Sequence, residues 1–163
     1  MLKYVSQTAQ LARSYYSGIG KQGIIFPAAF LVSTGIGTIT LGMIFYARDV
    51  VKLAPAMVGT LAATWLITYF FSCLFLRPLL SRMRPEFLII GSTLFCSIFI
   101  ACMAGAIRLD LIFLSYGLFG VSLAFFWSPL MGWLSADVEG ERLGLLVSRF
   151  NLSWGTGAII SPY

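Results

Sequence analysis

The chain has 163 residues, of which 59% are hydrophobic and only 10% are charged. Soluble domains are about 45–50% apolar and about 25% charged, so this sequence cannot cover a globule with a polar surface. Histidine is absent, which excludes a histidine general base and haem or zinc sites built on imidazole. The net charge of +5 is not gathered into a basic run with interleaved aromatics, so we expect no nucleic-acid partner.

Charged residues divide the chain into long apolar blocks. A helix crosses about 30 Å of hydrocarbon with about 20 apolar residues, and four charge-free blocks reach that length. They run from Gln22 to Ala47, from Leu53 to Leu76, from Phe87 to Ile107 and from Leu111 to Ala136. The pattern predicts an all-α, multi-pass protein of the cell (inner) membrane.

The predicted elements begin with a polar segment, residues 1–22, which we expect on the cytoplasmic side. It is either a short helix lying on the membrane surface or a frayed tail. Five transmembrane helices follow, at about 23–46, 55–76, 87–107, 111–135 and 145–163. The connectors are short, and Arg108-Leu109-Asp110 is only three residues. Short connectors make consecutive helices antiparallel, which predicts an up-and-down bundle.

Lysine and arginine are unequally divided between the two ends of the predicted helices. With a cytoplasmic N-terminus, eight of them lie on the inner side and three on the outer side. This bias follows the positive-inside rule and predicts an N-terminus in the cytoplasm. The outer three are Arg48, Lys52 and Arg108.

Two predicted helices carry rows of hydroxyl side chains. In the second helix they recur every four residues, which keeps them on one side. In the first helix they stand among glycines. Each row favours either close helix packing, with hydroxyls bonded to the preceding turn, or the wall of a water-filled path. The rows are Thr60, Thr64, Thr68 and Ser72, and Ser33, Thr34, Thr38 and Thr40.

The fourth and fifth helices contain further polar and helix-bending residues. Pro129 removes a backbone hydrogen bond and is expected to bend the fourth helix, in which Tyr116 either packs or faces a solute. Asn151 in the fifth helix is costly in hydrocarbon unless it is bonded, so it should face protein or a cavity. No acidic residue lies within a charge-free block, and no catalytic or metal-binding constellation is visible. We therefore expect no enzyme, no metal and no cofactor.

Three degenerate motifs carry a family resemblance. The loop after the second helix, residues 77–84, keeps Leu79 and Arg82 of a pattern that usually reads Gly-x-Leu-Ala-Asp-Arg-x-Gly-Arg. The other two patterns lie in the fourth and fifth helices. The pattern of the fourth helix is Arg-x-x-x-Gly followed by a later Ala-Asp and an arginine. This chain keeps the glycine, the Ala-Asp and the last arginine, and it has a tyrosine at the position of the first arginine. The fifth keeps the spacing of Gly-x8-Gly-x3-Gly-Pro with two serines in place of glycines. Their residues are Tyr116, Gly120, Ala136, Asp137 and Arg142, and Ser148, Gly157, Ser161 and Pro162.

On these residues the chain resembles the N-terminal part of a transporter of the major facilitator superfamily. The resemblance implies twelve helices in two six-helix halves, with a solute held between the halves and moved by alternating access. This chain would be an N-terminal fragment with helices one to five of the first half. Its partners would be a small solute with or without a coupling ion, the bilayer and the remaining helices.

The resemblance also directs the choice of site residues. Hydrogen bonding to the solute is assigned to Thr34, Thr38, Tyr116 and Asn151, and apolar stacking to Trp154. Loop and gating roles are assigned to Leu79, Arg82, Gly120, Asp137, Arg142, Gly157 and Pro162. Two alternatives stay open: a small non-transporting membrane subunit, and a membrane-embedded enzyme.

Overall fold

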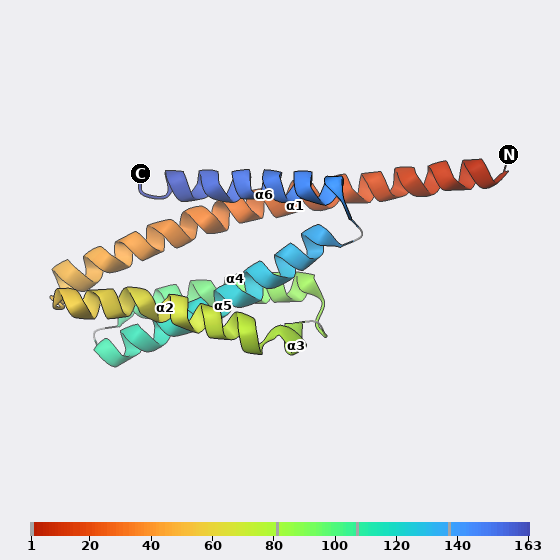
Figure 1. Ribbon diagram of the computed structural model, residues 1–163. Coiled ribbons are helices and arrows are strands. Elements are labelled where there is room, and N and C mark those ends of the chain that lie inside the picture. Colours follow the sequence, from red (N-terminus) through yellow and green to blue (C-terminus); the bar gives the residue numbers. More distant parts are fainter. Residues whose placement is uncertain (1, 81, 107, 137) are drawn as a thin grey trace. The chain divides into compact units, whose positions relative to one another are not determined.

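The computed structural model describes residues 2–80, 82–106, 108–136 and 138–163, and it describes side chains from Gly23 onward, apart from those of residues 77 and 80. These residues form helices joined by short connectors, and no strand occurs among them (Figure 1). The all-α prediction is therefore confirmed.

Three of the predicted transmembrane segments match their helices within two residues at each end. They are α2 (Pro55–Phe75), α4 (Pro85–Gly105) and α5 (Leu109–Ser135). Pro55 and Pro85 each stand at the start of a helix, where the missing N–H would have no partner and the fixed φ suits the first turn. A four-residue helix, α3 (Arg77–Leu80), follows α2.

The first and last helices differ more from the prediction. Helix α1 runs from Leu2 to Phe45 and continues as a π-helical turn, η1 (Tyr46–Val50). The polar N-terminal segment is thus part of the same helix as the first apolar block. Helix α6 (Glu141–Ile160) begins four residues before the predicted start, directly after Gly140, whose φ of 63° favours glycine.

Four helical segments in the described ranges are long and apolar enough to cross a membrane: Gly23–Val50, Pro55–Phe75, Pro85–Gly105 and Leu109–Ser135. Helix α6 is more polar and is not among them, so the fifth membrane span stays a prediction. Large apolar side chains are exposed along these helices, Phe70 and Leu74 by more than half of their surface. Such exposure is costly in water and is expected in lipid.

The chain divides into two compact units. The unit of residues 38–136 is organised around α5, which packs against both α2 and α4 (Figure 1). In the most apolar stretch of the α5 span 56% of the residues are buried, against 11–17% in the other three spans. Helix α5 is therefore the centre of this unit, and the outer faces of α2 and α4 are the ones available to lipid.

The second unit joins residues 1–37 and 137–163. In it, α6 lies alongside the stretch of α1 that contains Phe26 and Thr34, and the N-terminal part of α1 extends beyond α6 (Figure 1). Leu146, Phe150 and Gly157 form the buried side of α6. Their spacing of four and seven residues places them on one face of the helix.

Candidate functional site

Side-chain hydroxyls hold α1 and α6 together at two levels. The Ser153 hydroxyl donates to the Phe26 carbonyl over 2.6 Å, and the Thr34 hydroxyl lies 3.3 Å from the Gly157 carbonyl. Thr34 also donates to the Phe30 carbonyl in its own helix over 2.9 Å. Hydroxyls that bond to backbone carbonyls of a neighbouring helix stabilise helix pairs in a membrane, so Thr34 has a packing role here.

Glycines bring the two backbones close together at the same place. A Cβ on Gly157 would lie 2.5 Å from the Phe30 carbonyl oxygen and 3.1 Å from Cβ of Ser33. A Cβ on Gly37 would overlap the side chain of Ser161. The small residues of the fifth-helix motif, Gly157 and Ser161, therefore serve close packing within this unit.

A second close contact joins α2 to α5. The Thr68 hydroxyl donates to the Gly117 carbonyl over 2.8 Å. A Cβ on Gly120 would collide with the Trp65 carbonyl oxygen and the Thr68 hydroxyl. The packing interpretation of the hydroxyl row is thus confirmed for Thr68. Gly120, which was expected to have a gating role, is the residue that lets the α5 backbone approach α2.

Two other members of that row bond within α2. Thr60 donates to the Ala56 carbonyl and Thr64 to the Thr60 carbonyl, each over 2.9 Å. Ser72 is buried, and Cys73 lies 3.9 Å from the Ser128 hydroxyl of α5. The Thr60 and Thr64 hydroxyls are thus satisfied by backbone at the preceding turn, as is usual in membrane helices.

Tyr116 is the most deeply buried of the predicted solute ligands, with 1% of its surface exposed. Its ring stacks on Phe119, one turn later in α5, with centroids 6.0 Å apart. The Thr40 side chain lies close enough to interact with the Tyr116 hydroxyl. Both hydroxyls are buried, and neither forms a hydrogen bond of regular geometry within the described part of the chain.

The remaining predicted ligands lie on helix surfaces. Thr38 and Asn151 are exposed, and Trp154 is 46% exposed. Thr34, Asn151 and Trp154 belong to the unit that contains α6, whereas Thr38 and Tyr116 belong to the unit around α5. Each unit thus contributes some of the five, and the structure does not collect them in one unit.

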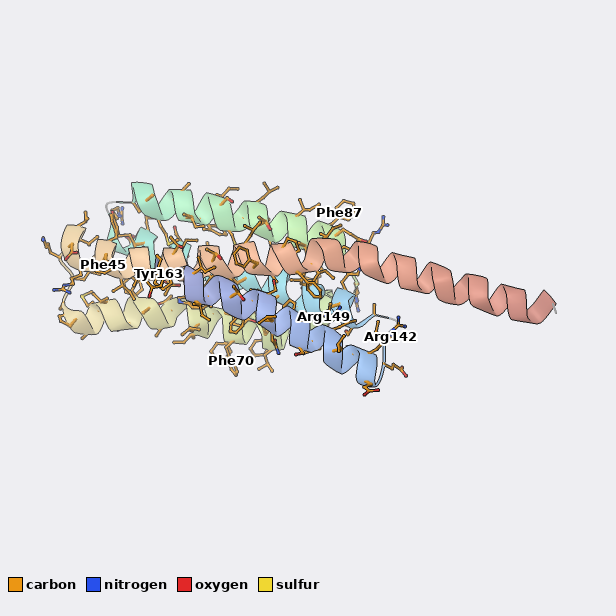
Figure 2. All side chains as sticks on the ribbon, turned by 90° about the horizontal axis from the view of Figure 1, so that it is seen from above. Phe45, Phe70, Phe87, Arg142, Arg149 and Tyr163 are labelled. Carbon is orange, nitrogen blue, oxygen red and sulfur yellow. The ribbon has the colours of Figure 1, made fainter. Side chains whose placement is uncertain are left out.

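The loop residues are mostly at helix ends. Leu79 is 47% exposed in α3, and its carbonyl accepts a hydrogen bond from the Arg82 N–H over 3.1 Å. Arg142 lies in the first turn of α6, and Pro162 follows the last (Figure 2). Asp137 lies outside the described residues. Within the described ranges, no three histidine, cysteine, aspartate or glutamate side chains are grouped to hold a metal ion.

Two residues of the site were not selected from the sequence. Thr40 stood in the hydroxyl row of the first helix, but burial of its oxygen without a partner depends on the surrounding helices. Gly117 matters through its carbonyl, which a sequence pattern does not reveal.

No family model matches the chain, and neither the search of curated proteins nor the search of solved structures finds a match.

Proposed function

We propose that this multi-pass membrane protein is part of a secondary active transporter of the major facilitator type, which moves a small solute by alternating access. The observation that carries the proposal is the pair of unpartnered hydroxyls, Tyr116 and Thr40, buried among membrane-spanning helices. Leaving a buried hydroxyl unpaired costs about 1–3 kcal/mol. A polar ligand that pairs with both hydroxyls would recover that free energy, which supports a solute site beside Tyr116.

A strip of small and polar residues on α6 supports the same proposal. With about 100° between successive residues, Gly144, Asn151 and Gly155 lie along one strip away from Leu146 and Phe150, beside the exposed apolar Leu152 and Ile159. A Cβ added to Gly144 or Gly155 on this side would meet open space, and Asn151 between them is exposed. Within hydrocarbon an asparagine needs a protein or aqueous partner. Further transporter helices or a solute path would supply it.

The proposed roles are assigned unit by unit. In the unit around α5, Tyr116 and Thr38 offer hydrogen bonds to the solute. In the other unit, Asn151 offers a hydrogen bond and Trp154 an apolar face to a polar path. Thr34 keeps α6 against α1 through the Gly157 carbonyl, so its contribution is the position of α6. Gly120 and Gly157 each let two helices pack closely, which lets helices move as pairs when the path opens and closes.

The test compares two tyrosines in cells that express the complete gene product. Solutes that accumulate or disappear relative to cells without the protein are identified by untargeted mass spectrometry. Tyr116→Phe should reduce the flux of such a solute about tenfold, the loss expected for one hydrogen bond of about 1.4 kcal/mol. Tyr46→Phe is the matched control, because the Tyr46 hydroxyl already donates to the Ala106 carbonyl over 3.2 Å.

Flux that is equal in wild type and Tyr116→Phe would contradict the assigned role of Tyr116. The absence of any solute that depends on the protein would contradict the transporter proposal. The exposed polar side of α6 also fits a non-transporting subunit that packs against a larger membrane protein. That alternative predicts co-purification with such a protein in a fixed ratio and no flux.

A further inference from the structure

A groove of about 330 Å³ lies between α4 and α5, on helices of one unit. We call it the α4–α5 groove. None of the residues assigned to the solute lines it, so it is independent of the transporter proposal. Its lining includes aromatic side chains from both helices and one glycine: Phe87, Gly91, Phe95, Phe99 and Phe125.

The groove offers hydrocarbon and no free hydrogen-bond donor. Its two serines are Ser92 and Ser122. Each donates to a carbonyl of its own helix over 2.9 Å, Ser92 to Ile89 and Ser122 to Leu118. A polar solute would lose its hydration here without new hydrogen bonds, whereas each buried CH₂ of an alkyl chain gains about 0.8 kcal/mol. The occupant that fits this wall is an acyl chain.

The length of the groove agrees with one leaflet of a bilayer. Phe87 and Phe99 are twelve residues apart in α4, which corresponds to about 18 Å along a helix. Half of the hydrocarbon core is about 15 Å thick. The Phe87 end lies near the start of α4 (Figure 2), where a spanning helix meets the membrane surface, so a chain entering there would run toward the bilayer centre.

A cation stands at the end where a lipid headgroup would lie. The Arg84 guanidinium carbon is 5.9 Å from the centre of the Phe87 ring, and Arg84 is exposed. Arg82 is exposed in the same loop, and Glu86 is the acidic group nearby in sequence. Neither arginine forms an ion pair with a described acidic residue. Arginines beside an apolar groove at the membrane surface attract anionic lipid headgroups.

We propose that the α4–α5 groove binds an anionic phospholipid, with one acyl chain along Phe87, Phe95 and Phe99 and its phosphate at Arg84. The lipid would fill the gap between α4 and α5. It would also satisfy the charge of Arg84 where water and hydrocarbon meet.

The test measures lipid retention by native mass spectrometry of the purified chain. The probes are phosphatidylglycerol and phosphatidylcholine with identical acyl chains, added in equal amounts. Wild type should retain phosphatidylglycerol about fivefold more than phosphatidylcholine, since one arginine near the surface contributes about 1 kcal/mol. Arg84→Gln should abolish this preference while the helical circular dichroism signal stays the same.

Gly91→Leu tests the acyl-chain part of the proposal. A Cβ at Gly91 meets open space, so the larger side chain enters the groove and should lower retention of both lipids. Gly59→Leu on α2 is the control, since its Cβ position is equally open and it does not line the groove. Retention unchanged by Gly91→Leu, or a preference that survives Arg84→Gln, would overturn the proposal. Arg84→Gln changes only an exposed side chain, so its result stands even if Gly91→Leu impairs folding.

Discussion

Two glycines of α5 occupy opposite environments, although the sequence does not distinguish them. The Cβ position of Gly120 is filled by the backbone of α2 at Trp65 and by the Thr68 hydroxyl, whereas that of Gly132 is open. We predict that Gly120→Ala lowers the free energy of unfolding by about 1–3 kcal/mol through overpacking. Gly132→Ala should be neutral or stabilise by up to about 1 kcal/mol. Denaturant unfolding in detergent micelles measures both, and equal effects would contradict the close α2–α5 contact.

The two tyrosine hydroxyls allow a second comparison at the residue scale. The Tyr116 hydroxyl is buried without a partner among the described residues, and that of Tyr46 donates to the Ala106 carbonyl. Tyr116→Phe should leave the free energy of unfolding unchanged or raise it, because it removes an unsatisfied group. Tyr46→Phe should lower it by about 0.5–1.5 kcal/mol. The same unfolding assay checks both signs, and a large loss for Tyr116→Phe would show that its hydroxyl is paired.

At the scale of elements, the pairing of α1 with α6 rests on a hydroxyl that crosses between the helices. Ser153 donates to the Phe26 carbonyl, whereas Thr156 donates to the Leu152 carbonyl within α6. Removal of the Ser153 hydroxyl by Ser153→Ala should lower stability by about 0.6 kcal/mol, the average for hydrogen bonds between membrane helices. Thr156→Ala should have a smaller effect. A larger loss for Thr156→Ala than for Ser153→Ala would contradict the assigned contact.

The helices themselves were largely predictable, and the reasons are local. Charged residues bound the apolar blocks, so α2, α4 and α5 were placed within two residues. The start of α1 at Leu2 was not predicted, because a helix can continue past the end of an apolar block into polar sequence. The number of consecutive apolar residues locates a membrane span, but it does not determine how far the helix extends beyond that span.

The contacts between helices were less predictable. From the sequence, the hydroxyl row of α2 fitted either helix packing or the wall of a water path. The close approach of Gly117 and Gly120 in α5 shows that Thr68 has a packing role. The solute ligands chosen from the sequence came from helix positions alone. Burial separates Tyr116 from the exposed Asn151 and Thr38, and burial depends on neighbours far away in the chain.

For the whole molecule, we propose a multi-pass membrane protein with a polar solute path beside α6. The side of α6 that carries Asn151 should face that path. The side that carries Leu152, which is 72% exposed in this structure, should face lipid. Adjacent residues of one helix thus have different surroundings. This contrast allows water to be distinguished from lipid at the same depth of the membrane.

The most direct measurement is the reaction of single cysteines with a charged, membrane-impermeant thiol reagent in intact membranes. After Cys73, Cys96 and Cys102 are replaced by alanine, Asn151→Cys and Leu152→Cys are compared. Only a thiolate reacts, and a thiolate forms in water and not in hydrocarbon. If a polar path lies beside α6, Asn151→Cys reacts at least about tenfold faster than Leu152→Cys. Equal rates at the two positions would contradict a polar path beside α6.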